Sequence, residues 1–354
     1  MTAFLTIIIV LFIAVALWQM VKIFDLSQAN KSNAGVATEK DNKLNGYLML
    51  GFLAFIYGIT IVCFLKWGDL PLMSNAASKH GVGLDNLMII SMVLIFIVQT
   101  ITQFLLYYFA YKYRGEKGKK ALFYADNDKL EFIWTIIPVI VLAGLIIYGL
   151  FTWSDIMNVD QDDDTMVVEL YAQQFNWKAR YAGADNVLGE ANVRLINLDN
   201  ANILGLDESD PNAQDDIITT ELHLPVGKKV LFKMRSQDVL HSAYMPHFRA
   251  QMNCVPGMIT QFGFTPEVTT AEMRQNPDII DKVARINKIR ASKKDEIEAR
   301  GQDVRYEFDY LLLCNKVCGK SHYNMQMKII VESEEEFNAW LKEQKTFKNS
   351  LIKN

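Results

Sequence analysis

The sequence predicts two kinds of structure in one chain, α-helical transmembrane segments followed by an all-β domain. Nearly all of the long apolar runs lie within residues 1–153, whereas the rest breaks into short runs of β type. Of the 354 residues, 51% are hydrophobic and 21% charged, which is too apolar for a wholly water-soluble protein. The second part, about 200 residues long, is large enough to bury a core of its own.

Four apolar stretches are candidates for membrane spans, because a helix needs about 20 apolar residues to cross the hydrocarbon core. They are Thr2–Val21, Tyr47–Lys66, Leu87–Tyr111 and Phe132–Trp153. A cleaved signal peptide is the alternative for the first stretch. Against it, the stretch lacks a basic start, and Trp18-Gln19-Met20 is a poor small-residue cleavage site.

Basic residues in the short loops predict the orientation of these spans. They crowd the loops after the first and third spans, at Lys22, Lys31, Lys40 and Lys43, and at Lys112, Arg114, Lys117, Lys119, Lys120 and Lys129. The loop Gly68–Asn86 has only Lys79. Both basic loops are expected on the cytoplasmic or matrix side, and the C-terminal domain outside, whether or not the first span is removed.

The chain is therefore expected to comprise an extra N-terminal helix pair (1–86), a transmembrane hairpin (87–153) and an exterior domain (154–354). Short strand-like runs separated by turns favour a β-sandwich or barrel for the exterior domain. The runs are Met166–Ala172, Gln174–Tyr181, Ile217–Leu224, Lys229–Met234, Met258–Phe264, Tyr310–Leu313 and Met327–Val331. The charged segment 269–301 has helical periodicity and is expected as a helical insertion, and Ser333–Gln344 as a short amphipathic helix.

The stretch Asp155–Glu221 is markedly acidic, with only Lys178, Arg180 and Arg194 as basic residues. A solvated surface is the simpler interpretation. Alternatively, such an excess of negative charge can attract a basic partner and raise its association rate. Nucleic acid is disfavoured as a partner by the sign of the charge.

The strongest chemical signal is Cys314-x3-Cys318-x3-His322-x2-Met325. Thiolate, imidazole and thioether together are the ligands of a copper site that changes oxidation state. A single-copper blue site needs one cysteine, whereas two thiolates four residues apart can bridge two metal ions. A second imidazole is then required, and His241 offers it in the segment Ser236–Ser242.

Other chemistries remain open for these residues. Cys314 and Cys318 can form a structural disulfide in an oxidising compartment, and two cysteines with two histidines can bind zinc, although zinc does not call for Met325. The C-x-x-C spacing of redox dithiols and the C-x-x-C-H sequence of c-type haem attachment are absent from the sequence. The remaining candidates are interpreted as structural: His223 and His247 as surface or hydrogen-bonded histidines, His80 as an exterior-loop residue, Cys254 as a buried inert thiol, and Cys63 as a core or lipid-facing residue.

Three pieces of this chain resemble subunit II of the haem-copper cytochrome c oxidases, over roughly Leu87–Glu332. The first is Leu130–Pro138, similar to the Glu-x-x-Trp-Thr-Ile-x-Pro start of that family's second helix. The second is Asp238–Ser242, followed by Pro246 and Pro256-Gly257. The third runs from Cys314 to Met325. In this order, after a membrane hairpin, the three pieces are very specific.

The resemblance implies a cupredoxin-like β-sandwich with two copper ions in a binuclear copper A centre. Cys314 and Cys318 would then be bridging thiolates, His241 and His322 terminal imidazoles, and Met325 a weak axial ligand. The centre would accept electrons from a cytochrome c, or from a cytochrome c domain of a neighbouring complex. It would pass them to haem in catalytic subunit I, where oxygen is reduced. Implied partners are the other oxidase subunits and the lipid membrane, and the chain itself would hold no catalytic residue.

The sequence also departs from the family pattern. Lys316 stands where the family has a glutamate that ligates copper through its backbone carbonyl. Any residue supplies a carbonyl, but lysine cannot supply the carboxylate that helps to hold a magnesium at the subunit boundary, which puts that ion in doubt. Phe175 replaces the tryptophan nearest the electron donor in the family's aromatic electron-uptake motif, and Trp177 is retained. Glu131 resembles the glutamate at the mouth of a proton pathway; alternatively it is a first-turn helix carboxylate.

The extra N-terminal spans and the insertion 269–301 are also absent from the basic pattern. They favour a bacterial inner membrane with the C-terminal domain in the periplasm, and a hypothesis that they dock another complex as a permanent electron supply. Two alternatives to the oxidase subunit remain. One is a copper-free quinol oxidase subunit II scaffold, and the other is a membrane-anchored copper-delivery or thiol-redox protein.

Overall fold

The computed structural model describes residues 2–28, 37–68, 75–158 and 164–351. The chain divides into two units, one of residues 1–69 with 95–127, and one of residues 70–94 with 128–354. Each unit is described separately below. The two do not coincide with the domains expected from sequence, whose boundaries at residues 86 and 153 stay predictions.

The first unit consists of α1 (Thr2–Gln28), α2 (Glu39–Trp67) and the part of α3 (Lys79–Lys112) from Ile95 onward. Thr38 starts α2 with a reciprocal capping box to Asp41, which satisfies two otherwise orphaned donors. Aromatic contacts run along α2 and α3, with ring centroids 5.2 Å apart for Tyr47 and Tyr111.

Within the described part of the chain, three helices are long and apolar enough to cross a membrane: α2, α3 and α4 (Asp128–Met157). They contain the second, third and fourth expected spans. The first expected span lies in α1, where the side chains that the structure describes form a shorter apolar stretch, Val10–Ile23. Because every backbone group of a helix is bonded within the helix, such segments suit a bilayer.

One expected loop is wrong in part. Residues 79–86 were expected in the exterior loop Gly68–Asn86, but they form the first two turns of α3. His80 is therefore a helical residue and not a loop residue. The sequence misleads here because Lys79, His80 and Asp85 interrupt the apolar run without breaking the helix.

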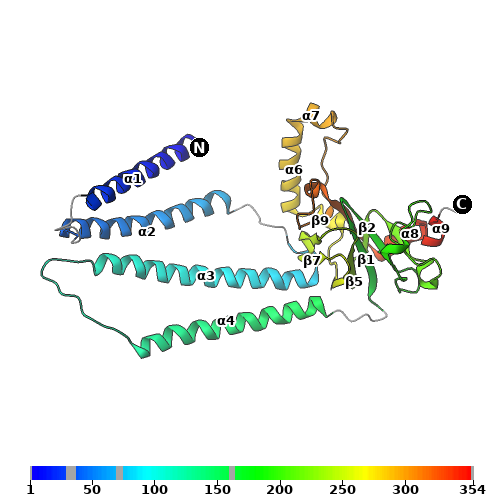
Figure 1. Ribbon diagram of the computed structural model, residues 1–354. Coiled ribbons are helices and arrows are strands. Elements are labelled where there is room, and N and C mark those ends of the chain that lie inside the picture. The colour runs from blue at the N-terminus through cyan, green and yellow to red at the C-terminus, as the bar shows by residue number, and fades with distance from the viewer. Residues whose placement is uncertain (1, 29–36, 69–74, 159–163, 352–354) are drawn as a thin grey trace. The chain divides into compact units, whose positions relative to one another are not determined.

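The second unit contains a β-sandwich of two five-stranded sheets (Figure 1), which confirms the predicted fold class. The first sheet has the order β3-β2-β1-β5-β8: Ile217–Thr219, Asn176–Tyr181, Met166–Gln173, Val230–Ser236 and Thr260–Phe264. The second has the order β4-β10-β9-β6-β7: Leu222–Pro225, Gln326–Glu332, Tyr310–Cys314, His241–Met245 and Ala250–Cys254. The pairs β1–β5 and β4–β10 are parallel, and the other pairs are antiparallel.

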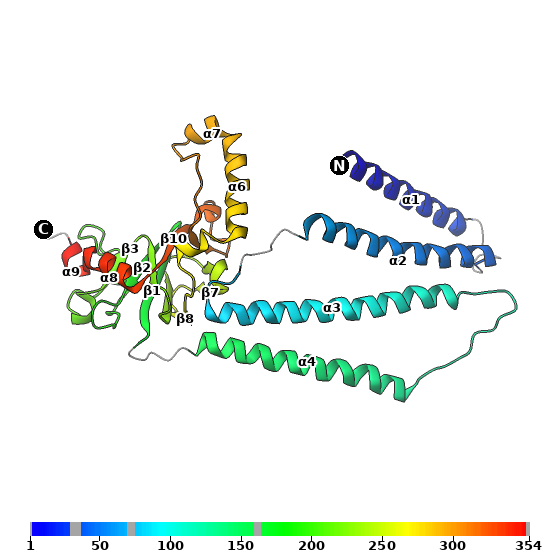
Figure 2. The same ribbon diagram turned by 180° about the vertical axis from the view of Figure 1, so that it is seen from behind.

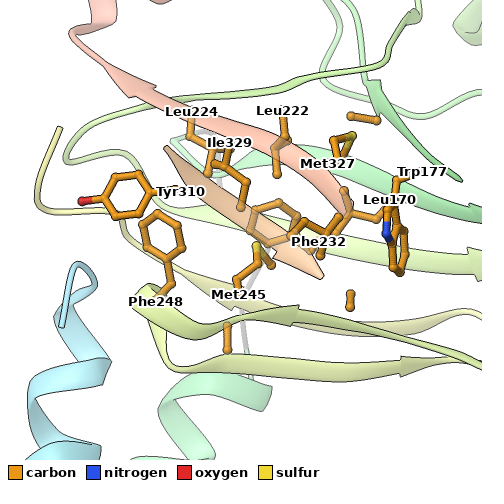
Figure 3. Close-up of a cluster of buried hydrophobic side chains, with 14 of the residues drawn as sticks. Leu170, Trp177, Leu222, Leu224, Phe232, Met245, Phe248, Tyr310, Met327 and Ile329 are labelled. Carbon is orange, nitrogen blue, oxygen red and sulfur yellow. The ribbon is translucent and has the colours of Figure 1, made fainter. Parts of the chain in front are cut away.

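The core lies between the two sheets (Figure 3). Leu170, Phe232 and Ile329 have no exposed surface there, and Phe248 and Tyr310 pack with ring centroids 4.7 Å apart. In Figure 3, Trp177 lies at one end of the labelled core, and Phe248 at the other. Alternating inward side chains from both sheets make such a core, as expected for a sandwich.

The single strand predicted over Ile217–Leu224 is wrong. β3 and β4 are separated by two residues and belong to different sheets. The Thr219 hydroxyl donates to the Glu221 carbonyl at 2.6 Å across the turn between them. The strands β6 and β7 were not predicted, because each has only five residues and Pro246 follows the first.

The insertion is helical, as predicted, and lies between β8 and β9 (Figure 2). It comprises α5 (Thr270–Met273), α6 (Pro277–Ala291) and α7 (Lys294–Glu298). The C-terminal amphipathic helix is α8 (Glu334–Glu343), with Ser333 as its N-cap, and α9 (Phe347–Ser350) follows.

Candidate metal centre

The fold brings the two ligand segments together through the pairing of β6 and β9. His241 is the first residue of β6, Cys314 the last of β9, and Ala243 is paired with Cys314 across the two strands. The Asn315 amide donates to the Ser242 carbonyl at 3.1 Å, which continues the pairing beyond the strand. His241 therefore lies beside the cysteine loop although 73 residues separate it from Cys314.

The loop from Cys314 to Met325 folds back on itself. The Cys314 amide donates to the Met325 carbonyl at 3.0 Å, so the loop closes where β9 passes into β10. A short 3-10 turn, η4 (His322–Asn324), presents His322 just before Met325. This single loop thus brings two thiol groups, one imidazole and one thioether close to one another.

The donor atoms converge at distances that suit bound metal. The sulfurs of Cys314 and Cys318 are 3.8 Å apart, Cys314 Sγ is 3.8 Å from His241 Nδ1, and Cys318 Sγ is 3.6 Å from His322 Nδ1. Met325 Sδ lies 3.8 Å from Cys318 Sγ. A metal ion binds thiolate sulfur at about 2.3 Å, so two sulfurs at this separation can share an ion on either side. Each histidine contacts a different sulfur, as a pair of metal ions would require.

The site is almost closed to water. His241 is fully buried, and Met325, Cys318 and Cys314 are nearly so. Both loop cysteines are free thiols, so the disulfide considered from the sequence is not formed in this structure. Burial raises the pKa of the Cys318 thiol to about 11, and the neighbouring Cys314 adds to the increase. The Cys318 thiol therefore loses its proton more readily when a metal ion binds its sulfur.

Asp238 orients His241. The Nε2 atom of His241 donates to Asp238 Oδ1 at 2.8 Å, which leaves Nδ1 facing Cys314. The amides of Gln174 and Val239 donate to the same carboxylate, each at 2.7 Å. These hydrogen bonds lower the pKa of Asp238 although its burial acts in the opposite direction. A carboxylate on the distal nitrogen of a metal-binding histidine fixes its ring and tautomer.

The two expected electron-uptake residues flank the loop in different ways. Trp177 is buried, its indole nitrogen lies 3.5 Å from the Met325 carbonyl, and its ring centroid is 6.2 Å from that of His241. Phe175 is half-buried and lies against Gly319. A Cβ at Gly319 would lie 2.8 Å from the Phe175 ring, and the φ of Gly319 is 143°. The loop can approach Phe175 this closely only with glycine at that position.

Lys316 points its side chain to solvent and its carbonyl towards the sulfurs. The Cys314 thiol donates to the Lys316 carbonyl at 3.2 Å. The backbone oxygen is therefore placed where a metal held by Cys314 could use it, whatever the side chain.

The remaining sequence candidates lie away from the sulfur cluster. Glu131 is exposed in the first turn of α4. His223 is buried, bonded to Glu332 at 2.8 Å and stacked on Trp340, which fits the expected hydrogen-bonded role. Burial raises the pKa of Cys254 to about 12, in keeping with an inert thiol. His247 is half-buried, and its Nδ1 has no hydrogen-bond partner among the described residues, so it is neither of the ordinary types expected.

Sequence reasoning missed two residues that support the site. Asp238 stands three residues before His241, and that spacing was a usable signal. Gln174 was predicted as the first residue of a strand, but its side-chain amide donates to the Cys318 carbonyl at 2.5 Å. That contact joins residues 144 positions apart, so no local pattern predicts it.

Comparisons with known proteins agree along most of the chain. The family model described as cytochrome C oxidase subunit II, transmembrane domain, matches residues 66–151, and that of the periplasmic domain matches residues 166–280. The second match ends before Cys314, so it does not test the loop ligands.

Three curated relatives are representative. The alternative cytochrome c oxidase subunit 2 of Bradyrhizobium diazoefficiens is 34% identical over 242 residues, 68% of this chain and 72% of that protein. The cytochrome c oxidase subunit 2 of Alkalihalophilus pseudofirmus is 23% identical, covering 73% of this chain and 57% of that protein. The protein of the same description from Cereibacter sphaeroides is 23% identical, covering 70% and 72%.

Proposed function

This chain belongs to the cytochrome c oxidase subunit II family, and on that premise we propose that its exterior domain holds a binuclear copper A centre. As a family member it is a membrane subunit of a terminal oxidase complex and serves electron transfer. The proposal adds the metal, its ligands, the donor and the acceptor. Electrons would come from a cytochrome c, or a cytochrome c domain of a neighbouring complex, and go to haem in catalytic subunit I.

One observation carries the proposal: the two free thiols lie 3.8 Å apart with a different imidazole beside each. Zinc would need only four of these donors, and Met325 would then have no role. A copper-free quinol oxidase scaffold would have no use for five converging donors. A copper-delivery protein must release its ion, whereas four of the five donors of this site (His241, Cys314, Cys318 and Met325) are buried.

When bound, the copper pair supplies a one-electron redox couple with little rearrangement. The residues of this chain would provide the rigid frame for it. Cys314 and Cys318 would share the ions, His241 and His322 would each hold one, Met325 would be a weak axial ligand, and Lys316 would offer its carbonyl. Asp238 keeps the Nδ1 atom of His241 free of a proton, and the buried surroundings exclude water.

Phe175 and Trp177 are the proposed electron-uptake residues. Phe175 reaches the surface beside the loop, and Trp177 connects that position to His241 and Met325. The acidic stretch 155–221 would attract a basic donor to this domain over distance.

Three further proposals concern magnesium, proton uptake and location. The Lys316 ammonium cannot ligate magnesium, so we expect no magnesium through this residue. Glu131 would lie at the mouth of a proton pathway into the catalytic subunit. The proposed location is a bacterial inner membrane, with the exterior domain in the periplasm.

The test is metal analysis and spin resonance on the oxidase complex purified in mild detergent. We expect two coppers in this subunit beyond those of the catalytic subunit, a purple colour, and a spin signal shared equally between two copper nuclei. Zinc, a single localised copper, or no metal would contradict the proposal.

We also propose that the helical insertion docks a neighbouring complex. Ile280 and Ile289 of α6 are 52% and 61% exposed, so this charged helix also offers a partner two apolar side chains. Deleting Gln275–Lys294 should release a partner that co-purifies with the intact complex, and Ile280→Asp with Ile289→Asp should do the same without shortening the chain. If either folded variant retained every respiratory partner, the insertion would have no docking role.

A further inference from the structure

The start of α3 is bound to the β-domain by a shielded ion pair. Arg249 donates from Nε and Nη2 to the two oxygens of Asp85, each at 2.8 Å. The side chains are only 7% and 26% exposed, respectively. A bidentate pair of this kind fixes direction as well as distance, and its loss leaves a poorly hydrated charge.

Four hydrogen bonds to backbone carbonyls accompany this ion pair, one donated by the Ser78 hydroxyl and three by backbone amides. They run from Ala77 N to His247 O at 2.8 Å, from Ser78 Oγ to Phe248 O at 2.7 Å, from Glu267 N to Ala77 O at 2.8 Å, and from Lys79 N to Thr265 O at 3.2 Å. Ala77 and Ser78 are completely buried. The first residues of α3 and the segment before it are thus built into the edge of the β-domain.

Gly81 in the first turn of α3 lies close to the preceding segment and to Arg249, and a larger residue there would displace its neighbours. A Cβ at Gly81 would lie 2.8 Å from Ser78 Oγ and 3.1 Å from Arg249 Cγ. The Tyr148 hydroxyl of α4 donates to the Gly83 carbonyl at 3.2 Å, so the same turns of α3 are also held by the second hairpin helix. Asp85 is therefore part of a junction between the hairpin and the β-domain.

Arg249 adopts a backbone conformation that few arginines do. Its φ is 53°, in the left-handed region, and its Nη1 donates to the Pro246 carbonyl at 3.0 Å. The guanidinium thus holds the short turn η3 (Pro246–Phe248) from one side and α3 from the other. A strained residue held this firmly indicates a position where geometry matters.

The junction is connected to the metal centre through one strand. β6 begins with His241 and ends at Met245, directly before η3. In Figure 3, Phe248 lies at the end of the core opposite Trp177, which contacts the ring of His241. The ion pair and the metal centre thus occupy opposite ends of the same rigid element.

We propose that Asp85 and Arg249 are positioning residues that fix the metal domain on its membrane hairpin and so set the rate at which an electron leaves the metal centre. The inference rests on the proposed electron-transfer function. An electron passes from the reduced centre to the haem of the catalytic subunit without any bond being made or broken. Because such a rate falls exponentially with distance, a small rotation about the junction changes it, while the metal ligands stay in place.

The test uses the assembled complex with Asp85→Asn, Arg249→Gln, and the charge exchange Asp85→Arg with Arg249→Asp. Arg274→Gln is the control, because it breaks an ion pair of the same 2.8 Å length to Asp309. Arg274 lies in the insertion but outside the segment Gln275–Lys294 that is tested for docking. Three quantities are measured: copper content with its spin signal, deuterium exchange at the Ala77 and Lys79 amides, and the rate of electron transfer from copper to haem after a light-driven injection.

Copper content and spin signal should be the same in all variants. Amide exchange at Ala77 and Lys79 should rise about tenfold in the two single variants, and electron transfer should slow severalfold. The charge-exchange variant should recover part of the amide protection and part of the electron-transfer rate. Arg274→Gln should change neither of these two quantities. The proposal is overturned if the transfer rate stays at the wild-type value in both single variants, or if the loss is as large in the control.

The metal-independent measurement separates two kinds of failure. If the wild-type complex held no copper, the proposed function would fail and the electron-transfer part of this inference with it. Amide exchange would still decide whether the ion pair holds the domain. Unchanged exchange in Asp85→Asn and Arg249→Gln would overturn the positioning role, whatever the metal.

Discussion

Two buried polar clusters of the β-domain differ in the groups that they contain and in how the charges of these groups are balanced. The metal-centre cluster consists of His241, Cys314, Cys318, His322 and Met325. The ionic cluster consists of Glu169, Arg180, Asp216 and Arg235 on the first sheet and the loop that covers it. Both are shielded from water, but only the ionic cluster is neutralised by its own members.

The ionic cluster pairs acidic with basic side chains, although Asp216 Oδ1 has no hydrogen-bond partner among the described residues. Glu169 lies between two arginines, 2.6 Å from Arg180 and in direct contact with Arg235, and Arg180 also reaches Asp216 at 3.1 Å. Although burial opposes ionisation, the two guanidinium groups keep the pKa of Glu169 below its usual value. These residues join β1, β2 and β5 to the loop before β3, so their role is to hold the fold. Glu169 and Asp216 also show that the acidic stretch is not wholly a solvated surface.

The metal-centre cluster gathers donors of one kind. Its sulfurs and nitrogens lie 3.6–3.8 Å from one another, and no carboxylate or guanidinium belongs to the set. Thiolate, imidazole and thioether groups collected in this way are the donors that a copper ion uses. The contrast distinguishes residues gathered for stability from residues gathered for chemistry.

The largest effect is expected from removing a shared sulfur. Cys318→Ala should abolish the two-copper spin signal completely, because each ion would lose a bridging ligand. Cys254→Ala is the matched control: Cys254 is also buried and is paired with His241 in the β-ladder, but it lies outside the donor set. Metal analysis of both variants checks the difference. Equal loss of copper in the two would mean that Cys254 also serves the centre.

Breaking the ionic cluster should cost stability and leave the metal chemistry intact. Glu169→Gln leaves two buried guanidinium groups without their shared carboxylate, and the loss should be about 3–5 kcal/mol in the free energy of unfolding. Denaturant unfolding of the exterior domain measures it, with exposed Glu221→Gln as the control, expected within about 0.5 kcal/mol. If the copper spin signal of the folded fraction of Glu169→Gln differed from wild type, the two clusters would not be independent.

Asp238 shares a feature with each cluster. Both oxygens of its carboxylate accept hydrogen bonds, and one of these bonds orients the candidate metal ligand His241. Asp238→Asn should lower copper affinity by about 10–100-fold, as loss of such a supporting carboxylate does elsewhere. Competition with a copper chelator gives the affinity. Asp199→Asn, which changes an exposed acid of the acidic stretch 155–221, should leave the copper affinity unchanged. An unchanged affinity in Asp238→Asn would mean that Asp238 only shapes its loop.

His247 is the smallest case, a half-buried imidazole whose Nδ1 atom has no hydrogen-bond partner among the described residues. Burial, aided by the charges of Lys282 and Arg249, lowers its pKa to about 4. Between pH 6.5 and 4 the unfolded chain therefore binds a proton that the folded domain does not, so stability is full above pH 6.5 and falls with pH through this window. His247→Leu should remove roughly 1–3 kcal/mol of this loss. Unfolding measured at several pH values checks it, and an unchanged pH profile would count against a neutral His247.

The sequence determined the parts of this protein that depend on neighbours along the chain. Long apolar runs dictate membrane-capable helices, because a helix bonds its own backbone within four residues. The candidate ligands of the loop could be proposed for the same reason, since Cys314 to Met325 are twelve consecutive residues. Helical periodicity likewise predicted the insertion, and the cap at Ser333 predicted α8.

The tertiary structure decided what depends on pairing between distant segments. Only the pairing of β6 with β9 brings His241 to Cys314, and only sheet formation sends β3 and β4 to different layers. Asp85 and Arg249, 164 residues apart, carry no signal in the sequence beyond their charges. Partners at such separations are selected by packing and burial, which depend on the whole fold, and a local pattern holds no information about them.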